Sequence, residues 1–130
     1  MTASGATNSR RETRVLVVDD DPDVRGFIVE ALEEQGYIVR EAADGREGIA
    51  EVDRETPDLI VLDFIMPGLS GADVARHARK RRPDQPILFV SGYSETDAVK
   101  RTAPDAPLLA KPFRAEALQK AVRGALPPAG

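Results

Sequence analysis

The chain has 130 residues, of which 42% are hydrophobic and 31% are charged, and its formal net charge is −4. This length suits one ordinary domain with a hydrophobic core, and the composition excludes a disordered chain. The negative net charge argues against direct binding of nucleic acid, and the absence of cysteine excludes disulfides, thiolate catalysis and cysteine-ligated zinc.

The N-terminal residues and the apolar runs of the chain bear on its location in the cell. The first twelve residues, MTASGATNSRRE, are polar and small and lack the apolar stretch of a secretory signal. No apolar run approaches the roughly 18 residues that a membrane-spanning helix needs. We therefore expect a cytoplasmic protein with no membrane partner. A disordered tail (residues 1–12) should precede one domain (13–126) and a short C-terminal tail (127–130).

The first predicted strand and helix have clear signals. Residues 14–18, RVLVV, form an apolar run rich in β-branched side chains, which predicts a strand. In residues 22–35 the apolar side chains are three and four positions apart, which is the period of a helix. Asp21 is a good N-cap, Pro22 suits the first turn, and Gly36 is a good helix stop.

The rest of the chain continues this alternation. Further strands are predicted at residues 37–41, 58–62, 86–90 and 107–110, and further helices at 45–55, 70–82, 94–101 and 114–125. The helix at 94–101 is short, and Pro104 closes it off. Strands that are apolar on both faces and alternate with helices predict an α/β fold. We expect a doubly wound, five-stranded parallel sheet of the flavodoxin-like order 2-1-3-4-5, with a short or irregular fourth helix.

Polar residues stand at the carboxyl ends of four predicted strands, where doubly wound sheets bind their ligands. They are Asp19, Asp20, Asp21, Asp63, Ser91 and Lys111. Carboxylates at close range raise one another's pKa unless a cation compensates, and oxygen ligands without His or Cys suit magnesium or manganese. A carboxylate beside such a metal can attack phosphorus. The pattern therefore indicates a magnesium site that receives a phosphoryl group.

Four motifs span these strand ends, and they are VLVVDDDPDVR, DLIVLDFIMPGLSG, FVSGYSE and AKPF. Their order and spacing resemble the receiver domain of response regulators in two-component (phosphorelay) signalling, over about residues 14 to 125. The chain is similar to receivers of hybrid histidine kinases and to single-domain regulators. The resemblance implies a signalling module rather than an enzyme. Such a module takes a phosphoryl group from a histidine kinase or phosphotransfer protein and relays a conformational signal to a downstream effector protein.

The resemblance also implies a role for individual residues. It implies a phosphoacceptor, a magnesium site, a switch hydroxyl and a lysine that contacts the phosphoryl group. The phosphoacceptor is Asp63; the magnesium ligands are Asp20, Asp63 and the backbone carbonyl of Ile65, with Asp19 acting through a water; the hydroxyl is that of Ser91; and the lysine is Lys111. A cis peptide bond between Lys111 and Pro112 is implied as well.

One position departs from the family pattern. Leu108 stands three residues before Lys111, where many receivers carry an aromatic switch residue. The usual inward turn of an aromatic ring is therefore not expected. The chain also ends soon after the last predicted helix, whereas a DNA-binding output domain would need roughly 60 further residues. We expect output through a partner protein, or a chain that is one piece of a larger protein.

Three other functions compete with this interpretation. An aspartyl-nucleophile phosphatase is disfavoured by Ile65, because many such enzymes carry a second Asp at that position. A flavodoxin-like cofactor binder is disfavoured because three acids follow the first strand, where a phosphate loop rich in Ser, Thr and Gly would lie. An interaction domain that works without phosphorylation is disfavoured by the complete set of acids, hydroxyl and lysine.

Several polar residues are expected to be structural. Asp21 is predicted to act as a helix cap, Asp44-Gly45 to form a turn, and His77 to face solvent. The basic cluster in residues 76–82 is interpreted as a helix C-terminus with complementary charge rather than as a nucleic-acid site.

Overall fold

A five-stranded parallel sheet forms the centre of the protein, with the strand order β2-β1-β3-β4-β5 that the sequence predicts. The computed structural model describes residues 13–92 and 96–127, so the N-terminal tail, part of the FVSGYSE motif and the last three residues lie outside it. Its strands are β1 (Arg14–Val18), β2 (Ile38–Ala42), β3 (Leu59–Asp63), β4 (Ile87–Ser91) and β5 (Leu108–Ala110).

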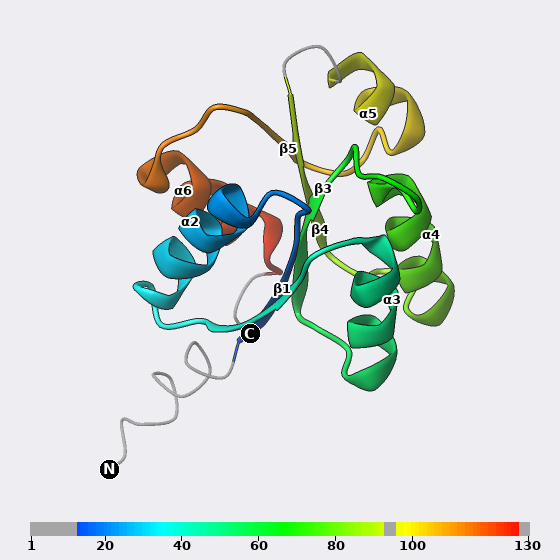
Figure 1. Ribbon diagram of the computed structural model, residues 1–130, viewed down its shortest axis with the longest axis horizontal. Helices are drawn as coiled ribbons and strands as arrows, with labels where there is room; N and C mark the ends of the chain where they lie inside the picture. Colours follow the sequence, from blue (N-terminus) through cyan, green and yellow to red (C-terminus); the bar gives the residue numbers. More distant parts are fainter. Residues whose placement is uncertain (1–12, 93–95, 128–130) are drawn as a thin grey trace.

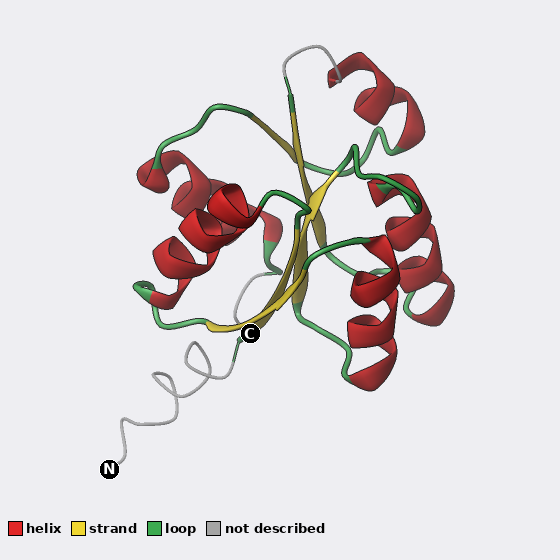
Figure 2. Ribbon diagram, viewed as in Figure 1, coloured by secondary structure: helices red, strands yellow, loops and turns green. Residues whose placement is uncertain are grey.

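Helices cover both faces of the sheet (Figures 1 and 2). On one face α2 (Pro22–Glu33) and α6 (Ala115–Ala125) lie side by side. The other face is covered by α3 (Gly45–Arg54), α4 (Gly71–Arg81) and α5 (Thr96–Thr102). Every residue of β3 and β4 is buried, which explains why these strands are nearly continuous apolar runs.

The first turns of three helices are fixed by the side chains that precede them. Asp21 accepts hydrogen bonds from two backbone N–H groups of α2, and Asp44 accepts one from Glu47 at the start of α3. Ser70 and Asp73 form a reciprocal capping box at the start of α4. The predicted helix-cap role of Asp21 is confirmed, and Asp44, which was predicted to lie in a turn rather than in a site, is the N-cap of α3.

Some boundaries differ from the prediction. Strands β3 and β4 each extend one residue further, because the parallel ladder pairs Asp63 with Val90 and Ser91 with Ala110. Helix α2 ends at Glu33, two residues early, and the chain then turns through Gly36, whose φ of 90° favours glycine. The seven-residue α5 confirms the short fourth helix.

The prediction for the only histidine is wrong in part. His77 does not simply face solvent, because its Nε2 lies 2.8 Å from the Asp53 carboxylate of α3 and its side chain is 32% exposed. Arg81 contacts the same carboxylate at 3.2 Å, so these side chains join α3 to α4. No helix in the described ranges has the length and apolarity to cross a bilayer.

Candidate phosphoryl-transfer site

Three acidic side chains meet at the carboxyl end of the sheet. Asp19 and Asp20 follow β1, and Asp63 is the last residue of β3, which pairs directly with β1. One carboxylate oxygen from each residue lies within 4.8 Å of the others. The sequence-based expectation that these acids share one site therefore agrees with the geometry.

The ammonium group of Lys111 also lies at this acidic cluster. Lys111, directly after β5, has its Nζ 3.5 Å from Asp19 Oδ2 and 3.6 Å from Asp63 Oδ1. Its backbone N–H donates to the carbonyl oxygen of Ser91 at 2.8 Å, which ties the end of β5 to the end of β4. The Lys111–Pro112 peptide bond is cis, as the resemblance implies.

Burial makes the acidic cluster electrostatically unfavourable without a counter-ion. Asp19 and Asp63 are only 1% and 4% exposed, whereas Asp20 is exposed. Burial, followed by the nearby charge of Asp19, raises the pKa of Asp63 to about 7, and the Lys111 ammonium only partly opposes this. The pKa of Asp19 is also raised, chiefly by burial.

Two buried oxygens in the site lack hydrogen-bond partners among the described residues. They are Asp19 Oδ2, which has only the Lys111 ion pair, and Ser91 Oγ. Buried polar atoms are normally satisfied, and leaving one unpaired is unfavourable. Three carboxylates without a nitrogen or sulfur ligand suit a hard divalent cation, and an unpaired hydroxyl suits an anionic oxygen. These residues therefore fit magnesium together with a phosphoryl group.

The loop between β3 and α4 is held close to the acidic cluster by a glycine. A Cβ atom on Gly71 would lie 2.3 Å from the carbonyl oxygen of Asp63, and the Gly71 N–H donates to the Phe64 carbonyl at 2.9 Å. Only glycine allows α4 to begin this close to the end of β3. The loop carries Ile65, whose side chain is 52% exposed, and Met66, which is buried.

Leu108 occupies the position where many receivers carry an aromatic switch residue. Leu108 is half-buried, pairs with Phe89 in the β4–β5 ladder, and packs against the core on the α3–α4–α5 face. Leu108 is therefore a strand residue that packs against the core on this face of the sheet.

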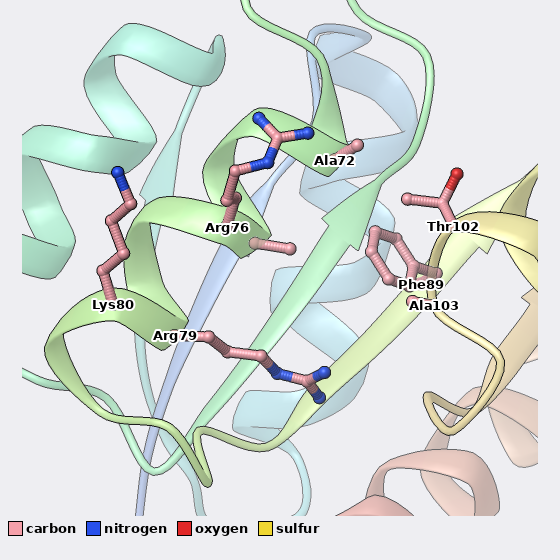
Figure 3. A pocket seen from close by; sticks show the side chains of 8 residues that line it. Ala72, Arg76, Arg79, Lys80, Phe89, Thr102 and Ala103 are labelled. Carbon is pink, nitrogen blue, oxygen red and sulfur yellow. The ribbon is translucent and has the colours of Figure 1, made fainter.

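A hollow of about 390 Å³ lies between α4 and α5 and has none of the acidic cluster residues in its lining. Figure 3 shows Arg76 and Arg79 on one side of it, Thr102 on the other and Phe89 between them. Arg76 is paired with Asp73 at 2.9 Å, and Arg79 contacts Asp105 at 3.6 Å. These arginines already have counter-charges, which agrees with the interpretation of residues 76–82 as a charge-complemented helix end.

Known proteins share both the sequence pattern and the fold. The family model of the response regulator receiver domain matches residues 15–123. The chain is 35% identical over 106 residues to the response regulator receiver protein CpdR of Brucella abortus, covering 77% of this chain and 85% of CpdR. It is 40% identical over 124 residues to the sensor kinase CckA of the same organism, covering 91% of this chain but only 13% of CckA.

A solved structure extends the comparison to a bound metal. The response regulator protein TrrA of Thermotoga maritima, in complex with Mg²⁺ and BeF, superposes with a TM-score of 0.79. It is 34% identical in sequence, and the match covers 88% of this chain and 99% of TrrA.

Proposed function

The chain belongs to the response regulator receiver family, whose members are phosphoacceptors in signalling, and we propose that Asp63 accepts the phosphoryl group in this chain. The observation that carries this assignment is the burial of Asp63 beside two other carboxylates and 3.6 Å from the Lys111 ammonium. A carboxylate in such a dry site is a poorly solvated nucleophile, and the lysine can pair with the incoming anion.

The donor is a histidine kinase or a phosphotransfer protein that carries a phosphorylated histidine. One carboxylate oxygen of Asp63 forms a bond to phosphorus while the bond from phosphorus to the imidazole nitrogen breaks, and that nitrogen keeps the electron pair. The product is an aspartyl phosphate on β3 and a free histidine on the donor.

Asp20, Asp63 and the backbone carbonyl of Ile65 would hold magnesium, with Asp19 reaching the ion through a water molecule. Manganese fits the same oxygen ligands. When bound, the ion neutralises charge on the transferring group. The 4.8 Å grouping of the three carboxylates supports this assignment, and so does the magnesium in the TrrA complex.

Ser91 and Lys111 would grip the phosphoryl oxygens after transfer. The Ser91 hydroxyl is buried without a partner among the described residues, and Lys111 already approaches Asp63. Because these residues end β4 and follow β5, a new hydrogen bond and ion pair there would pull on both elements. We propose that an effector protein in the cytoplasm detects this change, and that residues 13–126 are the unit that undergoes it.

Acetyl phosphate tests this proposal without a partner protein. With magnesium it should add one phosphoryl group to the wild-type chain by mass spectrometry, and Asp63→Asn should abolish the addition. Asp84→Asn is a matched control, because the Asp84 side chain is 85% exposed and pairs with Arg82 rather than with a residue of the acidic cluster. Equal labelling of Asp63→Asn and the wild type would overturn the assignment.

A further inference from the structure

Arg25, on the first turns of α2, reaches back to the loop that carries the acidic pair. Its Nη1 donates to the backbone carbonyl oxygen of Asp19 at 2.7 Å. Its Nε donates to Glu41 Oε1 at 2.9 Å, and Glu41 lies near the carboxyl end of β2. The arginine side chain is only 18% exposed, so it fills the space between the loop and β2.

The carbonyl that Arg25 holds is part of the peptide group between Asp19 and Asp20. Because a peptide group is planar, fixing its oxygen also restricts the N and Cα atoms of Asp20. The other side of Asp19 is fixed as well, since its backbone N–H donates to the Ala42 carbonyl at 3.2 Å. Arg25 thereby restricts the point from which the exposed Asp20 carboxylate extends.

The contact depends on the shape of the guanidinium group. Arginine presents its N–H donors in a rigid planar fork, and here two nitrogens of that fork bind two different acceptors. A lysine ammonium is a single point charge and would not hold both acceptors in a fixed relation. Glu41 also neutralises the guanidinium, which reduces its repulsion of a cation at the acidic cluster.

We propose that Arg25 is a positioning residue for the acidic pair and raises the affinity for magnesium without contacting the ion. This inference rests on the proposed magnesium site. It predicts that removing Arg25 changes the magnesium affinity in the direction opposite to the one that charge alone would give. If the arginine acted only through its charge, removing it would strengthen the binding of a cation; if it acts by positioning Asp20, removing it weakens that binding.

The test is a titration of the wild-type chain, Arg25→Ala and Arg25→Lys with MgCl₂, followed by the amide NMR signals of residues 19–20 and 63. We expect about tenfold weaker magnesium binding in Arg25→Ala, as for other residues that orient metal ligands, and weaker binding in Arg25→Lys as well. Arg54→Ala is the matched control, because Arg54 is 67% exposed and its guanidinium pairs with Glu51 of α3 rather than with a residue of the acidic cluster.

A second measurement separates positioning from general destabilisation. Labelling by acetyl phosphate should need more magnesium in Arg25→Ala to reach half its maximal rate, while the rate at saturating magnesium stays near that of the wild type. Magnesium affinity in Arg25→Ala equal to or above that of the wild type would overturn the inference. If Arg25→Ala fails to fold, the affinity of Arg25→Lys decides in the same way. A wild-type chain that binds no magnesium would instead overturn the proposed site itself.

Discussion

The ammonium nitrogen of Lys111 lies 3.6 Å from a carboxylate oxygen of Asp63, and this contact joins the segment after β5 to the last residue of β3. The same lysine is tied to β4 through its backbone N–H. A change in charge at Asp63 therefore acts directly on Lys111, which links β5 to the segment before α6.

Removing this ammonium should separate phosphorylation from the conformational response. We expect Lys111→Ala to be labelled by acetyl phosphate, but to show much smaller shifts of the amide NMR signals in β5 and α6 on labelling. Lys80→Ala, which removes an exposed lysine on α4, should respond like the wild type. Full wild-type shifts in Lys111→Ala would contradict this role.

The raised pKa of Asp63 should make the metal-free protein less stable as the pH rises. Its pKa moves from the ordinary 3.8 to about 7 on folding, so the native state keeps a proton that the unfolded state releases. The stabilising contribution of the protonated Asp63 is therefore fully present below about pH 4 and is lost as the pH rises through 7. Each pH unit between the two pKa values corresponds to about 1.4 kcal/mol, so the contribution of Asp63 to the free energy of unfolding is at most about 4 kcal/mol.

Asp63→Asn should lose less stability over the same pH range, because an amide does not ionise. Urea unfolding at pH 5 and pH 8 with a chelator present measures the difference. We expect the stability advantage of the variant over the wild type to be larger at pH 8 than at pH 5, by at most about 3 kcal/mol. Parallel pH profiles of the two proteins would show that Asp63 does not ionise in a buried site.

Magnesium should stabilise the native state by mass action. At about ten times the dissociation constant, the gain is about 1.4 kcal/mol, which corresponds to a rise of about 5 °C in the melting temperature. Asp20→Asn should shift much less, because it removes a carboxylate from the acidic cluster. Calcium-free differential scanning fluorimetry with graded MgCl₂ makes the comparison, and equal shifts in both proteins would exclude Asp20 as a ligand.

The acidic cluster could be predicted from the sequence because parallel strands all end at one edge of a sheet. The parallel sheet with helices on both faces was predicted from apolar strands that alternate with helices, and the strand order was predicted because five such units suit the flavodoxin-like fold. Asp63 and Ser91 were predicted to follow their strands, since a polar side chain suggests the end of a buried run. The ladder nevertheless continues through both residues, because its hydrogen bonds use only backbone groups.

Contacts between residues far apart in the chain could not be predicted in this way. Arg25 and Glu41 are sixteen positions apart, and His77 and Asp53 are twenty-four apart. Which side chains meet depends on how closely the helices and strands pack, and hydrophobic periodicity gives no information on the distances between these elements. Gly71 gave one readable signal, a glycine directly after the helix-cap residue Ser70, although its contact with Asp63 appears only in the folded chain.

The close approach of Gly71 to Asp63 should make any side chain at this position unfavourable. We expect Gly71→Ala to lower the free energy of unfolding by about 1–3 kcal/mol, because the added methyl group overlaps the Asp63 carbonyl oxygen. Gly26→Ala is the matched control, since nothing lies within 4 Å of its added Cβ in α2, and it should gain up to about 1 kcal/mol. Destabilisation of both variants to the same extent, in urea unfolding, would contradict the steric explanation.

The side chain of Ile65 should lengthen the lifetime of the aspartyl phosphate. It lies two residues after Asp63, is 52% exposed, and has no group that could orient a water molecule toward phosphorus. Orienting the nucleophile is a large part of what an active site contributes, so hydrolysis should be slow and the phosphorylated chain should last for minutes or longer.

We expect Ile65→Asn to shorten the lifetime of the aspartyl phosphate about tenfold, which corresponds to about 1.4 kcal/mol in the barrier to hydrolysis. Leu69→Asn, an exposed apolar residue of the same loop, should leave it unchanged. Mass spectrometry of the labelled chain over time measures the decay, and equal lifetimes in the wild type and Ile65→Asn would mean that water reaches phosphorus without help from this position.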